Sequence, residues 1–93
     1  MSEQDMKINS RVRKIFVEKN LNLAFVDVST RSGVVNIRGE LKKMTGSEMT
    51  DSQVAKLIFQ LEGTISHVKD VKRVLFSLHG WEKSRGKWKK QGS

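Results

Sequence analysis

Residues 50–78 constrain the fold of this chain more than any other stretch. The stretch begins with Thr50, whose hydroxyl can cap a helix N-terminus by accepting a hydrogen bond from a backbone N–H of the first turn. The apolar residues that follow have the i, i+3, i+4, i+7 spacing of an amphipathic helix: Val54, Leu57, Ile58 and Leu61. Gly63 comes next, at a position where helices commonly end in a left-handed residue, and residues 74–78 are rich in β-forming side chains. The stretch therefore predicts a capped helix that ends at Gly63 and leads into a strand.

The residues before this stretch predict one more helix and two strands. Residues 1–6 are polar and are expected to be frayed, whereas residues 7–19 carry a second helical stripe of apolar side chains. Residues 24–30 alternate between apolar and polar side chains, as a half-buried strand does, and residues 34–41 repeat that alternation. Between them, Gly33 supplies the positive φ of a tight hairpin turn. The order of elements is then helix, strand, strand, helix, strand.

This order predicts an α+β fold (α-β-β-α-β) with both helices on one face of a three-stranded mixed sheet. Residues 7–78 would form that domain and residues 79–93 a basic tail. Gly39 takes an inward position of the second strand, which predicts a bulge or the close approach of a helix. Residues 64–71 fit either a helical or an extended link. Eight apolar residues are expected to share the core: Ile15, Phe16, Val26, Ile37, Leu57, Ile58, Leu61 and Phe76.

Two short motifs resemble those of the BON domain, a family named for bacterial osmotic-shock and nodulation proteins. In that family the second strand commonly has the pattern V-x-L-x-G. The closing link and strand have the pattern V-x-x-V, followed by another apolar residue. The matching positions are Val35, Ile37 and Gly39, then Val68, Val71 and Val74. His67 stands where the family commonly has a glycine. The resemblance covers residues 8–78 and implies an α-β-β-α-β fold that binds rather than catalyses. Many members sit in the bacterial envelope, and some associate with phospholipids through paired copies.

The composition bounds both the location and the chemistry. The chain has no cysteine, so it has neither a disulfide framework nor a thiolate nucleophile or metal site. It has no apolar run long enough to span a membrane and no apolar leader, so we expect a cytoplasmic protein. It also carries one copy of the BON-like pattern, whereas many lipid-associated members carry paired copies. His67 and Asp70 have the spacing of a base and its orienting carboxylate, but no nucleophile accompanies them, and His79 stands alone. We therefore expect no enzyme, no metal and no cofactor.

The tail carries the strongest signal of function. Residues 79–93 contain five basic side chains and one acidic one, so they hold half of the net charge of +8. Both tryptophans of the chain lie among these cations, where an indole ring can stack on a base or rest at a lipid headgroup. Alternatively, Trp81 packs back on the domain and the rest is a solubilising tail. The candidate binding residues are Trp81, Lys83, Arg85, Lys87, Trp88, Lys89 and Lys90.

Two further basic clusters are candidates. Arg11 and Lys14 on the first helix are expected to form a patch together with Lys42 and Lys43, unless they only solvate a helix face. Arg38, Lys72 and Arg73 would line one face of the sheet if the second and third strands are neighbours.

These features predict a small, non-catalytic, BON-like binding module whose partner is an anionic macromolecule or an acidic lipid surface. One alternative is a nucleic-acid-binding protein that grips the phosphate backbone through its basic face and tail. Another is a structural module that pairs with itself through its sheet. The sequence leaves the partner and the oligomeric state open.

Overall fold

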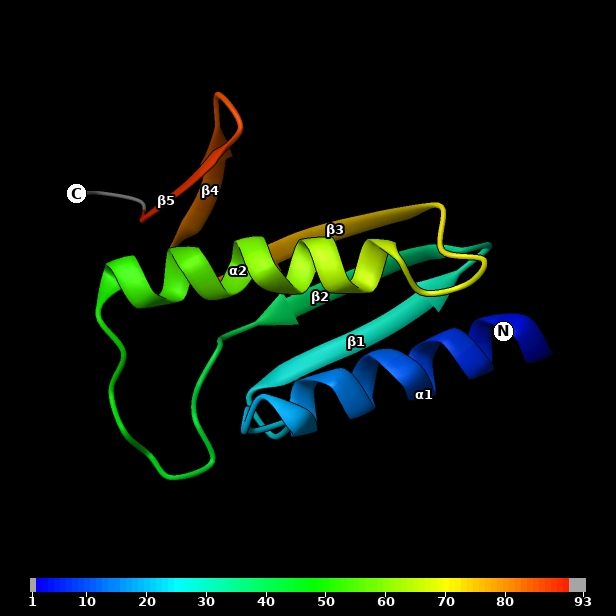
Figure 1. The fold of residues 1–93 in the computed structure, drawn as a ribbon, viewed down its shortest axis with the longest axis horizontal. Helices are drawn as coiled ribbons and strands as arrows, with labels where there is room; N and C mark the ends of the chain where they lie inside the picture. The colour runs from blue at the N-terminus through cyan, green and yellow to red at the C-terminus, as the bar shows by residue number, and fades with distance from the viewer. Residues whose placement is uncertain (1, 91–93) are drawn as a thin grey trace.

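The predicted order of elements is confirmed in the computed structural model, which describes residues 2–90. The first three strands form one mixed sheet of order β1-β2-β3, in which β2 pairs antiparallel with β1 and parallel with β3. A parallel pair needs a long crossover, and α2 supplies it (Figure 1). A second, two-stranded sheet follows. The elements are α1 (Glu3–Glu18), β1 (Val26–Arg31), β2 (Val34–Gly39), α2 (Asp51–Ser66), β3 (Arg73–Leu78), β4 (Trp81–Ser84) and β5 (Lys87–Lys90).

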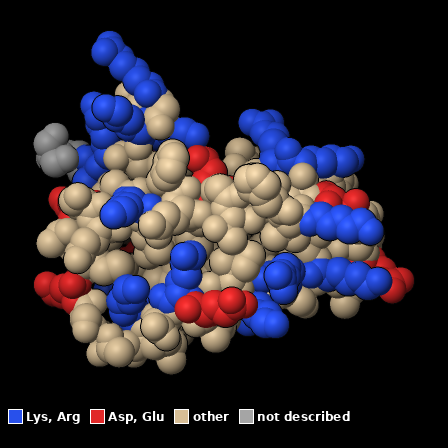
Figure 2. All heavy atoms as spheres, in the orientation of Figure 1, with Lys and Arg blue, Asp and Glu red and all other residues tan. Residues whose placement is uncertain are grey.

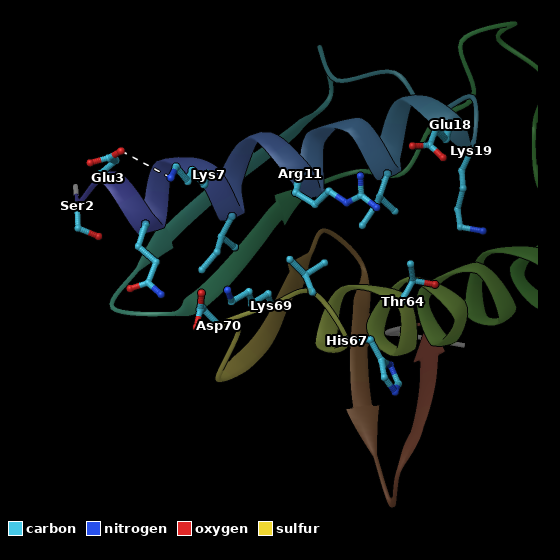
Figure 3. A pocket seen from close by; sticks show the side chains of 14 residues that line it. Ser2, Glu3, Lys7, Arg11, Glu18, Lys19, Thr64, His67, Lys69 and Asp70 are labelled. Carbon is cyan, nitrogen blue, oxygen red and sulfur yellow. Dashed lines mark ion pairs between the residues drawn. The ribbon is translucent and has the colours of Figure 1, made fainter.

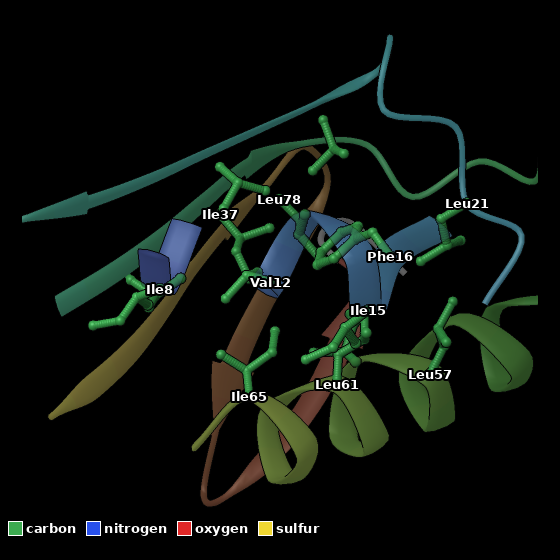
Figure 4. Close-up of a cluster of buried hydrophobic side chains, with 14 residues drawn as sticks. Ile8, Val12, Ile15, Phe16, Leu21, Ile37, Leu57, Leu61, Ile65 and Leu78 are labelled. Atoms are coloured by element: carbon green, nitrogen blue, oxygen red, sulfur yellow. The ribbon is translucent and has the colours of Figure 1, made fainter. Parts of the chain in front are cut away.

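One apolar core lies between the sheet and the two helices. The stripes of α1 and α2 meet over the inward residues of the strands, as Figure 4 shows. Seven of the eight predicted core residues are buried, and Phe76 is partly buried against the cluster. The best-buried large side chains come from both helices, from β2 and from Leu21 in the loop after α1, and include Phe16, Ile37, Ile58 and Leu61.

The start of α1 differs from the prediction of a frayed segment. Ser2 caps the helix, because its side-chain oxygen accepts a hydrogen bond from the Asp5 N–H at 3.0 Å. Asp5 is itself only 6% exposed, and its carboxylate accepts from the N–H groups of Gly33 (3.0 Å) and Ser32 (2.9 Å). These two residues both have positive φ, as a two-residue hairpin turn requires. A buried acid thus ties the first helical turn to the β1–β2 turn, 28 residues away along the chain.

The hydrogen bonds to Asp5 also set its acidity. The N–H donors of Gly33 and then Ser32 favour the charged carboxylate and hold the pKa of Asp5 below its ordinary value, against the smaller opposing effect of burial. No sequence pattern indicated this contact, because a single acid in a short polar segment has no periodicity.

The end of α2 also differs from the prediction. Gly63 lies inside the helix, which continues to Ser66, and the predicted stop at Gly63 is wrong. The reason is that Ile65 extends the apolar stripe by one more step and is fully buried. Turns then lead from His67 to β3, and Asp70 takes the left-handed conformation with φ 72°. At the other end, Thr50 and Gln53 form a capping box.

Position 39 requires glycine because another part of the backbone passes close to it. The sequence predicted a bulge or a nearby helix here, and the neighbour is instead the backbone just before β1. The φ of Gly39 is +110°, and a Cβ at this position would collide with the backbone carbonyl oxygen of Phe25, immediately before β1. The same carbonyl accepts a hydrogen bond from the Glu40 N–H at 2.8 Å. Only glycine fits this crossing of the two chains.

Candidate anion-binding surfaces

The predicted basic tail contains a β-hairpin. β4 and β5 pair antiparallel, with Trp81 opposite Lys90 and Lys83 opposite Trp88. The turn between them places Arg85 at φ 52° and Gly86 at φ 77°, the positive values typical of a tight two-residue turn. Residues alternate across a strand, so these four paired side chains share one face of the hairpin, which we call the inner face.

The inner face holds the hairpin on the domain through its tryptophans. Both tryptophan rings are partly buried against the core cluster. The Trp88 ring meets Phe76 of β3 edge to face, with centroids 5.6 Å apart and an interplanar angle of 77°, a favourable geometry for two aromatic rings. The ammonium group of Lys83 lies 6.0 Å from the Trp88 centroid. The two tryptophans therefore act as packing anchors, as the alternative for Trp81 predicted, rather than as free stacking surfaces.

Two ion pairs on the inner face add to this docking. Lys83 lies 3.1 Å from Glu62, and Lys90 lies 3.3 Å from Asp51, both on α2. All four side chains are at least a quarter exposed, so each pair contributes little to stability. Lys83 and Lys90, which the sequence assigned to a partner, are instead engaged within the chain.

The remaining hairpin cations form what we call the outer face. Lys87 and Lys89 alternate away from the inner face, and Arg85 occupies the turn; all three are exposed. Within residues 2–90 no carboxylate lies within ion-pair distance of any of them, although Glu82 is the strand partner of Lys89. In Figure 2 the basic side chains of this region stand out beyond the body of the molecule.

A groove between α1 and the end of α2 is a second basic surface. It has a volume of about 1290 Å³, and Ile8 and Ile15 are the isoleucines that line it. Figure 3 shows Arg11 and Lys19 on the α1 side and Thr64 and His67 on the α2 side. The charged side chains that line it have both signs: Lys7, Arg11, Lys19 and Lys69, with Glu3, Glu18 and Asp70. This mixture makes the groove a weaker anion site than the outer face of the hairpin.

The patch predicted around the first helix is divided. Arg11 lines the groove, whereas Lys14 does not. Lys43 donates from its ammonium group to the Lys19 carbonyl oxygen (3.4 Å) beyond the end of α1, and Lys42 lies 5.3 Å from the centroid of the Phe25 ring. Arg11, Lys42 and Lys43 thus each meet a different part of the chain, and Lys14 makes no hydrogen bond or ion pair within residues 2–90.

The sheet face predicted from Arg38, Lys72 and Arg73 is present in part. β2 and β3 are neighbours, and Arg38 and Arg73 both lie on the side of the sheet away from the helices. Lys72 lies just before β3 and its side chain passes over Gly33 at the edge. Lys72 therefore lies beside the β1–β2 turn and not in one of the cross-strand rows that contain Arg38 and Arg73. The sequence missed Arg31, which it assigned to the turn and which is the last residue of β1.

The histidines give no catalytic constellation. The Nδ1 atom of His67 lies 2.6 Å from the Gly63 carbonyl oxygen and so donates to it. His67 and Asp70 form no hydrogen bond with each other. Across residues 2–90, no three His, Cys, Asp or Glu side chains are grouped in a way that could hold a metal ion.

None of the helices within residues 2–90 is both long and apolar enough to cross a membrane. Protein-family models, curated proteins and solved structures give no significant match to this chain. The resemblance to BON domains therefore stays a prediction from the motifs, alongside an observed α-β-β-α-β order that agrees with it.

Proposed function

We propose that this chain is a small, non-catalytic, BON-like binding module that contacts a phosphate-bearing anionic partner through the outer face of its hairpin. The observation that carries the proposal is the division of the hairpin cations. The inner face is engaged with α2 and β3, while Arg85, Lys87 and Lys89 stay exposed and form no ion pair within residues 2–90. The cytoplasmic location expected from the sequence is part of this proposal.

The charge balance of the whole chain supports an anionic partner. Of 18 basic and 10 acidic side chains, four of each are joined in ion pairs, and Asp5 is occupied by the β1–β2 turn. Fourteen basic side chains then face six acidic ones, because the hydrogen bonds to Asp5 do not neutralise its charge, and this surplus of eight attracts anions over the whole surface.

The contact would depend on charge more than on insertion. The outer face and turn of the hairpin carry no large apolar side chain, and both tryptophans are held against the domain. An acidic lipid surface and a polyanionic macromolecule offer the same phosphate chemistry to these cations. Near an acidic membrane each Lys or Arg contributes about 1 kcal/mol, so three of them would change affinity on the order of 100-fold.

Charge neutralisation tests the proposal better than truncation, because removing the hairpin would also uncover Phe76 and part of α2. The test variant is Arg85→Gln/Lys87→Gln/Lys89→Gln. The matched control is Arg13→Gln/Lys14→Gln/Lys56→Gln, which removes the same charge from exposed helix positions. Binding is measured by co-sedimentation with vesicles containing phosphatidylglycerol, with neutral phosphatidylcholine vesicles, and by titration with duplex DNA at two salt concentrations.

The hairpin variant should lose most of its affinity for at least one anionic probe, whereas the control should lose much less. The more strongly affected probe identifies the partner class. Equal losses of affinity in both variants would mean that binding follows net charge alone, and would contradict a hairpin site. Binding to neutral phosphatidylcholine vesicles as strong as binding to phosphatidylglycerol vesicles would also contradict it.

A further inference from the structure

The face of the β1-β2-β3 sheet that points away from the helices is uncovered. Its inward counterpart is the buried core, but no described element packs over the outward side chains of the three strands. Those side chains lie in three cross-strand rows, because the register sets one residue of each strand beside the next. We call this surface the open face; it is separate from the hairpin.

The two outer rows carry arginines. Arg31, Val34 and Arg73 form one row, so the two arginines stand two strand spacings apart, about 10 Å. Arg38 lies in the other outer row, four residues along the strands and therefore about 13 Å away. All three arginines are exposed, and none is ion-paired within residues 2–90. The open face has one acid, Asp27, beside Arg38.

The central row carries two polar side chains whose hydrogen-bonding groups are not used by the described part of the chain. Ser29 and Asn36 are partly buried in the middle of the face, and Leu75 beside them is 37% exposed. Neither polar side chain makes a hydrogen bond to any other described residue. An amide that stays unpaired in the middle of a sheet can read the edge of a ligand that lies flat on it.

We propose that the open face binds a short single strand of nucleic acid, with the three arginines on its phosphates and bases and Asn36 on a base edge. Guanidinium groups pair with phosphate and also stack on bases. Bases of a single strand can be splayed flat over the sheet, whereas a duplex keeps its base edges inside the grooves. The spacing of the arginines leaves room for bases over the central row.

A second copy of the chain fits the open face less well. If two copies paired through this face, the three arginines and one acid of one copy would face the three arginines and one acid of the other. Like charges that lie close together would destabilise such a dimer. The apolar contribution is also small, because Leu75 and the half-buried Val34 are the only large apolar side chains on the face. The charge of the face thus selects an anionic occupant.

The test uses fluorescein-labelled 12-nucleotide RNA of mixed sequence, a duplex DNA of the same length and fluorescence anisotropy at several salt concentrations. The first variant is Arg31→Gln/Arg38→Gln/Arg73→Gln, compared with the helix control Arg13→Gln/Lys14→Gln/Lys56→Gln. Each phosphate contact of a single strand contributes roughly 0.7 to the slope of log K against log salt. The sheet variant should therefore lose up to about 2 units of slope on RNA, depending on how many of its arginines contact phosphates, and the control should lose much less.

The second variant, Asn36→Leu, keeps the charge and removes the amide. It should weaken RNA binding several-fold at an unchanged salt slope, whereas Gln60→Leu on the exposed side of α2 should have no effect. Circular dichroism verifies that each variant is folded. The proposal does not rest on the hairpin site, whose variant should leave the Asn36 effect intact.

Three results would overturn the proposal. One is an equal slope loss in the sheet variant and the helix control, and another is a larger loss of duplex binding than of single-strand binding when the three sheet arginines are replaced. The third is a concentration-dependent dimer, seen by sedimentation velocity, that the sheet variant abolishes, because it would assign the open face to a second copy.

Discussion

The domain from α1 to β3 and the hairpin that follows it are held by different forces. The domain surrounds a cluster of apolar side chains, several of which are fully buried. The hairpin has no buried residue of its own and is held by two half-buried tryptophans and two exposed ion pairs. Burial of apolar area stabilises far more than surface pairing does. The hairpin should therefore open while the domain stays folded.

The largest expected effect breaks the domain. Leu61 is fully buried between α2 and the sheet, so Leu61→Ala should lower the free energy of unfolding by about 2–5 kcal/mol. Urea unfolding followed by circular dichroism measures it. The matched control is Phe59→Ala, two positions away on the same helix and 70% exposed, which should change stability by roughly 0.5 kcal/mol or less. Similar losses in the two variants would contradict the described core.

A smaller effect separates the hairpin from the domain. Trp88→Ala removes the contact with Phe76 and should cost about 1–3 kcal/mol, below the roughly 3–5 kcal/mol of a fully buried tryptophan. Amide hydrogen exchange should show lost protection in β4 and β5 and unchanged protection in β2. If β2 loses protection to the same extent, the hairpin and the domain are one cooperative unit.

Acid should weaken the domain through Asp5. The folded-state pKa of Asp5 is lowered, so its stabilising effect is present above the unfolded value of about 3.9 and is lost as the pH falls through the lower folded value. Asp5→Asn should therefore be less stable than the parent at neutral pH, and the difference should shrink below about pH 4. A difference that is constant between neutral and strongly acid pH would refute the assigned contact.

The smallest expected effect concerns the ion pair between Lys83 and Glu62. Its coupling energy, from a double-mutant cycle of Lys83→Gln and Glu62→Gln, should be about 0.2–1 kcal/mol and should fall at high salt. A coupling that salt leaves unchanged would point to packing of the Lys83 stem on Trp88 instead.

The sequence predicted the domain well because its stripes repeat. Leu57, Ile58 and Leu61 recur at helical spacing, and Val35 and Ile37 recur at strand spacing. In each element the spacing of the apolar residues therefore predicts which face is buried. Such patterns fail at the ends of elements, where single contacts decide. Ile65 carries α2 beyond Gly63, and Asp5 orders the first turn of α1 through a partner that only the fold brings near.

The candidate site was less predictable, since it depends on which side of a strand each cation occupies. Trp81 and Lys83 are two residues apart and so point to the same face of a strand, as do Trp88 and Lys90. A turn that contains Gly86 separates the two pairs. This alternation was the available signal for a hairpin. The carboxylates on α2 that engage its lysines could not be inferred, because that contact joins elements without any local pattern.

The position of the two tryptophans has a spectroscopic consequence. The chain has no tyrosine, and both indole rings lie in the hairpin. Intrinsic fluorescence excited in the indole band therefore reports the hairpin alone, while far-ultraviolet ellipticity is dominated by α1 and α2. The molecule carries its own pair of independent reporters, and the separation between their two melting curves measures directly how far the hairpin and the domain are coupled.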